Sequence, residues 1–272
     1  MFKGKNFEFE LGSKTYIMGI LNVTDDSFYD GGKYNSKEKA LEHTKNMLRD
    51  GADIIDIGAQ STRPGHKTIS ADEELEIIKN YLPYIYNETK AVISVDTFYP
   101  TVAEYALQNG AAIVNDVSGA FSSEMAQVVK KHNAGWIIMH TGGGDADIVP
   151  KYENGVIESI KNFFIDVKNK CNDYGISFEQ ILLDVGIGFG KTTEQNIEIL
   201  RNLDSLNISP IMVALSSKRV VGETTNTEGY DRVYGTISAN VLSVAKGADF
   251  VRVHNVKENA LALKMADAIL RG

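Results

Sequence analysis

Short apolar runs recur along the chain, each bounded by polar residues or glycine. Most are rich in Ile, Val and Met and do not alternate with polar residues, which is typical of parallel strands covered on both faces. The eight runs are Tyr16–Leu21, Asp53–Ile57, Ala91–Val95, Ala112–Val114, Gly135–Met139, Ile181–Leu183, Ile211–Leu215 and Phe250–Val253.

Segments with helical periodicity lie between these runs. Ser36–Arg49 is amphipathic and is followed by Gly51, and Ser70 with Glu73 has the spacing of a capping box that opens a helix. Further helices are expected over Tyr99–Gln108, Glu124–His132, Val156–Asn172, Thr193–Leu203, Arg232–Ala245 and Asn259–Leu270.

The alternation of strands and helices predicts a (β/α)8 TIM barrel. The main rival is an open doubly wound sheet, but no GxGxxG motif follows the first strand. Before the barrel, Phe7–Leu11 and Lys14–Ile17 flank Gly12 and Ser13 and indicate an N-terminal β-hairpin that leads into the first strand. We expect residues 1–272 to form one domain, with 1–17 as the hairpin.

The net charge and the cysteine content of the chain exclude some classes of function and some cellular locations. The 28 basic and 36 acidic residues give a net charge of −8, which disfavours a general binder of nucleic acid or anionic membranes. Cys171 is the only cysteine, so no intrachain disulfide is possible. No apolar stretch approaches the roughly 20 residues that a membrane helix needs, and the N-terminal residues lack the apolar core of a signal peptide. The sequence therefore predicts a cytoplasmic protein.

A first group of polar residues follows the third, fourth, sixth and seventh apolar runs. In a TIM barrel these positions meet at the carboxyl ends of the strands, where the active site lies. Carboxylates and an amide together suit the N–H donors of a 2-amino-pyrimidinone edge, and a lysine adds a donor or cation. The group is Asp96, Asn115, Asp184 and Lys218. The alternative is that Asp96 and Asp184 only cap helices that begin near Thr97 and Thr192.

A second group follows the first, second and eighth runs and combines cationic side chains with hydroxyl and amide groups. Such residues suit a diphosphate, and an asparagine oxygen suits Mg²⁺. The group is Asn22, Thr62, Arg63, Arg252 and His254. Taken singly, Arg63 is better explained as a surface loop residue and His254 as a partly buried histidine.

The glycine-rich segment Gly186–Thr192 ends in Gly-Lys-Thr but is not a phosphate-binding P-loop, because Val185 stands where that motif needs its first glycine. Phe189 in this segment is either a packing residue or an aromatic wall for a flat ligand.

Several motifs, taken in order, identify a family. They are GILNVTDDSF (Gly19–Phe28), GADIIDIGAQSTRPG (Gly51–Gly65), SVDT (Ser94–Thr97), NDVSG (Asn115–Gly119), LDVGIGFGKT (Leu183–Thr192) and RVHNV (Arg252–Val256). The chain resembles dihydropteroate synthase, the folate-pathway enzyme of the pterin-binding barrel group. The motifs span residues 19–256.

The resemblance implies a reaction and a set of roles. The amine of p-aminobenzoate displaces diphosphate from 6-hydroxymethyl-7,8-dihydropterin diphosphate, in a homodimeric enzyme that uses Mg²⁺. The pterin would contact Asp96, Asn115, Asp184 and Lys218. The diphosphate would contact Asn22, Thr62, Arg63, Arg252 and His254, with Asn22 beside the metal. The p-aminobenzoate pocket would comprise Thr62, Pro64, Phe189, Lys218 and Arg219. Lys218, Arg252, His254 and Arg63 would be the catalytic residues.

The segment Ala214–Arg219 departs from the family pattern Gly-x-Ser-Arg-Lys-Ser. Ser217 replaces the arginine and Arg219 replaces the serine that normally lies near the p-aminobenzoate carboxylate. A paralogue that uses another aromatic amine or responds differently to sulfonamides is therefore an alternative. A non-catalytic pterin-binding or corrinoid methyl-transfer barrel is a further one, although it would not need the diphosphate-binding group.

Overall fold

The computed structural model describes residues 1–23, 36–60, 68–143 and 148–272. Eight parallel strands form a closed barrel: β3 (Tyr16–Asn22), β4 (Ile54–Gly58), β5 (Ile93–Asp96), β6 (Ala111–Asp116), β7 (Gly135–Met139), β8 (Ile181–Asp184), β9 (Ile211–Val213) and β10 (Phe250–Val253). The barrel closes because β10 pairs in parallel with both β9 and β3. The predicted (β/α)8 barrel is confirmed.

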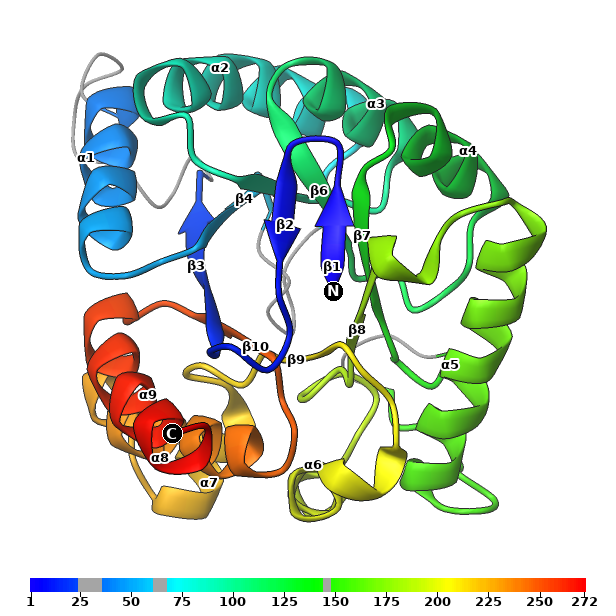
Figure 1. Ribbon diagram of the computed structural model, residues 1–272, viewed down its shortest axis with the longest axis vertical. Coiled ribbons are helices and arrows are strands. Elements are labelled where there is room, and N and C mark those ends of the chain that lie inside the picture. The colour runs from blue at the N-terminus through cyan, green and yellow to red at the C-terminus, as the bar shows by residue number, and fades with distance from the viewer. Residues whose placement is uncertain (24–35, 61–67, 144–147) are drawn as a thin grey trace.

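Helices form a ring around the strands, as Figure 1 shows. Within the described residues they are α1 (Ser36–Arg49), α2 (Ala71–Thr89), α3 (Pro100–Gln108), α4 (Ser123–His132), α5 (Val156–Asp173), α6 (Thr193–Arg201), α7 (Arg219–Thr225), α8 (Arg232–Ala245) and α9 (Val256–Leu270). Short 3₁₀ turns are η2 (Phe178–Gln180), η3 (Leu203–Leu206) and η4 (Gly229–Asp231). In the described ranges, no helix is long and apolar enough to cross a bilayer.

Two helix starts follow directly from local sequence. The predicted capping box at α2 is confirmed, because the Ser70 hydroxyl accepts from the Glu73 amide at 3.3 Å and the Glu73 carboxylate accepts from the Ser70 amide at 2.8 Å. Thr192 and Gln195 make an equivalent capping box at the start of α6. Thr192 therefore caps α6, and Asp184 is left for another role.

The N-terminal hairpin exists, but it lies earlier in the chain than predicted. Its strands are β1 (Phe2–Gly4) and β2 (Phe7–Phe9), which pair antiparallel around Lys5 and Asn6. The predicted pairing of Phe7–Leu11 with Lys14–Ile17 is wrong, because Tyr16 and Ile17 pair with β10 inside the barrel. The actual hairpin instead places three phenylalanines where they can be buried.

The hairpin closes the amino-terminal end of the barrel, and Figure 1 shows it lying across the middle of the strand ring. Phe2, Phe7 and Phe9 are buried in one cluster with inward-facing strand residues. The strand members of this cluster are Tyr16, Met18, Ile54, Ile113, Ile137, Leu182, Met212 and Phe250. A larger cluster fills the space between the barrel and the helices. The interior is therefore a packed core at this end.

The opposite half of the interior is polar. Side chains two residues apart on a strand share a face, so Asp56 points to the same side as Ile54, Asn115 as Ile113, and Asp184 as Leu182. Arg252 likewise shares the inward face with Phe250. The alternation that fills the bottom of the barrel with apolar groups thus delivers charged and amide groups at the carboxyl ends of the strands.

Candidate active site

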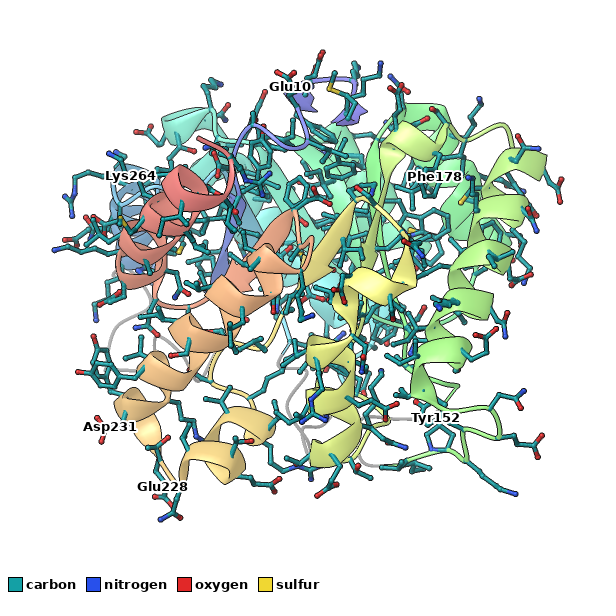
Figure 2. All side chains as sticks on the ribbon, turned by 60° about the horizontal axis from the view of Figure 1, so that its bottom comes forward. Glu10, Tyr152, Phe178, Glu228, Asp231 and Lys264 are labelled. Atoms are coloured by element: carbon teal, nitrogen blue, oxygen red, sulfur yellow. The ribbon has the colours of Figure 1, made fainter. Side chains whose placement is uncertain are left out.

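A cavity of about 550 Å³ opens among the carboxyl ends of the barrel strands. In Figure 2, Tyr152, Glu228 and Asp231 lie at the opposite end of the molecule from Glu10, which follows the hairpin. Of the residues predicted from sequence, Asn22, Phe189, Lys218, Arg219, Arg252 and His254 line this cavity. Thr62, Arg63 and Pro64 lie outside the described residues.

Arg252 links two buried carboxylates at the floor of the cavity. Its Nε donates to Asp56 Oδ2 at 2.7 Å, and its Nη2 donates to Asp96 Oδ2 at 2.7 Å. The Asn115 amide also donates to Asp56 Oδ2, at 3.0 Å. Within the described chain, Asp56 Oδ1 and Asn115 Oδ1 are buried without a hydrogen-bond partner. Buried polar atoms are usually paired, so these two oxygens are unsatisfied acceptors beside the Arg252 side chain. Arg252 lines the cavity, whereas Asp56, Asp96 and Asn115 are buried behind it.

Burial and charge act against each other in this network. Burial raises the pKa of Asp96 to about 7, and the Arg252 guanidinium offsets part of that shift. Burial alone would lower the pKa of Arg252, but Asp56 and Asp96 more than compensate and raise it. Arg252 therefore stays charged, and it uses two of its five N–H donors on these carboxylates.

Asp184 lies at the end of β8 and is 2% exposed. Its Oδ1 accepts from the Gly186 amide at 2.7 Å, and burial raises its pKa while Lys218 opposes the rise. Neither predicted pterin aspartate caps a helix: the N-cap of α3 is Tyr99 and that of α6 is Thr192. The capping alternative for Asp96 and Asp184 is thus ruled out.

Lys218 sits at the start of α7 and reaches across the cavity wall. Its Nζ donates to the Ile187 carbonyl at 2.7 Å and lies 4.5 Å from the centre of the Phe189 ring. Removal from water lowers the pKa of Lys218 to about 8, and the nearby Asp184 carboxylate opposes this effect. Phe189 faces the cavity instead of being enclosed in the core, which favours its reading as an aromatic wall.

The segment between β9 and α7 has an unusual backbone. Ser217 has a φ of 58°, in the left-handed region, and its amide donates to the Thr236 hydroxyl at 3.2 Å. Its carbonyl accepts from Arg232 Nη1 at 3.1 Å. Arg219 follows on the exposed edge of the cavity, 3.7 Å from Glu223. These contacts bring a third arginine, Arg232, to the cavity wall beside Arg219 and Lys218.

His254 and Asn22 complete the wall at the ends of β10 and β3. His254 Nδ1 lies 3.1 Å from the Ser216 hydroxyl, which also accepts from the His254 amide at 3.2 Å. No group of three or more acidic, histidine or cysteine side chains that could hold a metal occurs in the described residues. Asn22 lines the cavity and offers a side-chain amide oxygen, a type of group that Mg²⁺ accepts alongside phosphate oxygens.

Sequence reasoning missed two site residues. Asp56 is fully buried within β4, and the available signal was a lone carboxylate inside an apolar run. Arg232 had no signal beyond its place at the start of a helix. His140, which follows β7, is 1% exposed and its Nε2 lies 3.1 Å from the Ser159 hydroxyl, so it packs away from the cavity.

Comparisons with known proteins identify the family of the chain. The family described as pterin binding enzyme matches residues 18–254. A dihydropteroate synthase of Clostridium beijerinckii is 41% identical over 268 residues, which cover 97% of each chain. The chain belongs to the dihydropteroate synthase family of pterin-binding enzymes.

Solved structures of the dihydropteroate synthase family share the whole barrel. The Clostridium difficile enzyme, crystallised in the presence of pteroic acid, is 44% identical with a TM-score of 0.92, over 97% of this chain and 100% of that one. The Xanthomonas albilineans enzyme with 4-aminobenzoic acid is 34% identical with a TM-score of 0.88, over 95% and 94%. The fold and the cavity thus belong to a family whose members have been crystallised with pterin and aminobenzoate ligands.

Proposed function

We propose that this chain joins 6-hydroxymethyl-7,8-dihydropterin diphosphate to p-aminobenzoate and releases diphosphate and 7,8-dihydropteroate. The observation that carries the proposal is the cavity lined by Lys218, Arg252 and His254. Arg252 joins this lining to Asp96, which is buried with Asn115 and Asp184 toward the carboxyl ends of the barrel strands and does not itself line the cavity. One layer can accept the N–H groups of a pterin, and the other can hold an anion. Family membership supports the same reaction.

The pterin site in this proposal consists of Asp96, Asn115, Asp184 and Lys218. Asp184 keeps one oxygen for Gly186 and has its other oxygen available for a ligand donor. Asn115 has an unpaired buried oxygen, as judged from the described residues. We add Asp56 as the group that orients Asn115 and Arg252, because both donate to the same Asp56 oxygen.

The diphosphate site consists of Asn22, Thr62, Arg63, Arg252 and His254, with the loop residues Thr62 and Arg63 proposed from sequence alone. The cationic groups would offset the charge that grows on the departing diphosphate, which is the largest catalytic effect in this scheme. Mg²⁺ bound to the diphosphate and to Asn22 would supply further charge neutralisation.

The reaction breaks the bond between the exocyclic pterin carbon and the diphosphate oxygen, and the electron pair leaves with the diphosphate. The p-aminobenzoate nitrogen forms the new bond to that carbon and then loses a proton to solvent. The carbon develops positive charge as the bond breaks, and an arylamine is neutral near pH 7. The residues therefore need to position the reactants and stabilise charge, and no strong general base is required.

The p-aminobenzoate pocket consists of Thr62, Pro64, Phe189, Lys218 and Arg219. Phe189 offers a flat wall, and Arg219 offers a cation for the substrate carboxylate. Arg219 also supports the alternative of a paralogue that uses another aromatic amine or responds differently to sulfonamides, because it replaces the serine that the family places near the p-aminobenzoate carboxylate.

The test is to incubate the purified protein with Mg²⁺ and dihydropterin diphosphate, with and without p-aminobenzoate, and to identify the product by mass. Diphosphate release coupled to dihydropteroate formation is the expected result. Tight binding of the pterin diphosphate without p-aminobenzoate-dependent release would favour the paralogue. Absence of pterin binding would contradict the proposal and favour a barrel with another ligand.

We also propose that the chain forms a homodimer through helices α8 and α9. These helices pack against each other and expose Tyr234, Leu242, Leu261, Met265 and Ile269, each more than 60% accessible. Such an apolar surface is typical of a contact between subunits. Light scattering should give twice the 29.9 kDa of one chain, and Met265→Lys should give the single-chain mass. A single-chain mass for the unaltered protein would contradict the dimer.

We propose one domain for residues 1–272 and a cytoplasmic location. The hairpin packs its phenylalanines into the barrel end, which supports a single folding unit. Cys171 is buried and unpaired, which is consistent with a reducing compartment.

A further inference from the structure

Lys191 is a buried cation with no part in the reaction described above. It is 1% exposed and lies just after the loop that joins β8 to α6. Its Nζ donates to three main-chain carbonyls: His140 at 2.8 Å, Gly186 at 3.0 Å and Phe189 at 2.9 Å. Burying an ammonium group is costly, so its retention at this position needs a structural reason.

The three carbonyls come from two segments that meet beside the cavity. His140 follows β7, whereas Gly186 and Phe189 belong to the loop after β8. That loop lies directly against the end of β7: a Cβ atom at Gly186 would collide with the His140 carbonyl, and one at Gly190 with the Thr141 carbonyl. Both glycines have positive φ values, so the loop path is tight and its outward carbonyls need a donor. Lys191 is that donor.

The loop held by Lys191 carries two groups of the cavity wall. Phe189 lies on it, and the Ile187 carbonyl accepts the hydrogen bond that fixes Lys218 Nζ. Neutral lysine has only two N–H donors, so donating to all three carbonyls needs the ammonium form. Removal from water lowers the pKa of Lys191 to about 7, and the Asp184 carboxylate opposes this effect, so the three carbonyls act against the cost of burying the charge. Its charge also matches the partial negative charge of the carbonyls.

We propose that Lys191 is a positioning residue, which fixes the loop so that Phe189 and Lys218 form the wall against which the aromatic amine binds. The assignment of that wall rests on the proposed function. The tethering of the loop rests only on the described contacts. Tyr152 provides a second, weaker tether, because its hydroxyl donates to the Gly190 carbonyl at 2.7 Å.

The test compares Lys191→Met, Lys191→Arg and Tyr152→Phe. Lys191→Met should raise the KM for p-aminobenzoate by about tenfold or more, since a small misplacement of a positioning group has effects of this size. The equilibrium affinity for dihydropterin diphosphate should fall by a smaller factor, because three of the four residues of the proposed pterin site, Asp96, Asn115 and Asp184, lie on barrel strands. Lys191→Arg should bring the KM for p-aminobenzoate most of the way back to the value of the unaltered protein. Tyr152→Phe should shift the same parameter by a smaller factor without removing the buried cation.

Lys170→Met is the matched control, because Lys170 lies on the outer surface of α5, where it pairs with Asp166 and its Nζ lies 5.8 Å from the centre of the Phe121 ring. Hydrogen exchange gives a readout that does not depend on activity. The amides of Gly186 and Gly188 donate to Asp184 and Asn196, so a peptide covering 186–190 should exchange about tenfold faster in Lys191→Met while the barrel strands stay protected.

Two results would overturn the proposal. One is unchanged exchange of residues 186–190 together with an unchanged KM in Lys191→Met. The other is that Lys191→Met loses affinity for the pterin and for p-aminobenzoate equally, that Lys191→Arg does not restore either affinity, and that Tyr152→Phe does not reproduce the loss. Lys191 would then only stabilise the fold in general. Failure of the unaltered protein to form dihydropteroate would instead contradict the proposed function, and the exchange measurement would still decide the role of Lys191.

Discussion

The two ends of the barrel interior are built by the same strands and have opposite chemistry. At the amino-terminal end, Ile54 and Phe250 pack with the hairpin phenylalanines in an apolar cluster. Two residues further along the same strands, Asp56 and Arg252 form a buried ion pair at 2.7 Å. Because strand side chains share a face at every second position, a shift of two residues separates a core from a binding site.

The difference teaches where stability and function reside in this chain. Apolar packing at the amino-terminal end (the lower end) contributes stability because it buries apolar surface. The carboxyl end of the strands (the upper end) buries carboxylates, and desolvation raises the pKa values of Asp96 and Asp184 there. Because burying such groups removes them from water, they lower the stability of the fold. The two ends should therefore respond differently to substitution.

The largest expected effect is a loss of folding stability, caused by a substitution at the amino-terminal end of the barrel. Phe250 is fully buried, and its ring centre lies 5.1 Å from that of Tyr16 and 5.6 Å from that of Phe2. Phe250→Ala should lower the free energy of unfolding by about 3–5 kcal/mol, measured by denaturant titration. Ile165→Ala on the exposed face of α5 is the control and should stay within about 0.5 kcal/mol. If the folded Phe250→Ala protein lost as much kcat/KM as Lys218→Ala does, the separation of stability and function between the two ends would be contradicted.

At the upper end, Lys218→Ala should show the opposite behaviour. It should lower kcat/KM by about 10²–10³-fold, because the cation faces the cavity and stabilises charge during the reaction. The midpoint of urea unfolding should not fall, since burial already lowers the pKa of Lys218 to about 8 and so penalises its charge. Lys246→Ala, which removes an exposed lysine paired with Asp204, is the matched control. Full activity of Lys218→Ala would remove this lysine from the site.

Asp184→Asn tests the difference between the two ends at a single residue, because it should change pterin affinity and the free energy of unfolding in different directions. An asparagine oxygen can still accept from the Gly186 amide, so the loop should remain in place. The affinity for the pterin should fall by about 10- to 100-fold with the loss of a charge-assisted hydrogen bond. The free energy of unfolding should stay equal or rise, because a buried charge is removed. Calorimetry and denaturant titration measure the two quantities, and unchanged pterin affinity would contradict the assignment of Asp184.

The smallest effect concerns pH. Burial raises the pKa of Asp96 from 3.8 to about 7, so between these values the folded state holds a proton that the unfolded state has lost. The contribution of Asp96 to stability should therefore fall as pH rises through this window. Pterin affinity should rise over the upper part of the window, because the ionised carboxylate accepts hydrogen bonds from the ligand more strongly than the protonated acid does. Asp96→Asn should weaken this pH dependence of binding, and an identical dependence in both proteins would argue against Asp96 as its source.

Much of the fold was predictable because its signals are local. Each barrel strand is an apolar run, and Ser70 with Glu73 sets the start of α2 through contacts within three residues. The hairpin was misplaced because its position depends on burial of Phe2, Phe7 and Phe9 against strands far away in the sequence. Helix α7 was missed because it has only seven residues and contains Gly222.

The candidate site was predictable where polar residues follow a strand, as for Asp184 and Lys218. Asp56 was missed because it lies inside its strand, and its role appears only through Asn115 and Arg252, which are 59 and 196 positions away in the sequence. Lys191 was missed for the same reason, since its carbonyl partner at His140 comes from a neighbouring strand end. Pairings of this kind depend on the closed barrel and leave no mark in local sequence.

The most direct test of the central claim, that the upper polar layer is the pterin site, is a crystal structure with pteroic acid bound. We predict that the pterin ring lies below Lys218 with its N–H groups donating to Asp184 and with Asn115 Oδ1 paired. The aminobenzoate portion should extend along Phe189 toward Arg219. A ligand bound elsewhere, with Asp184 and Asn115 making no contact to it, would contradict the account.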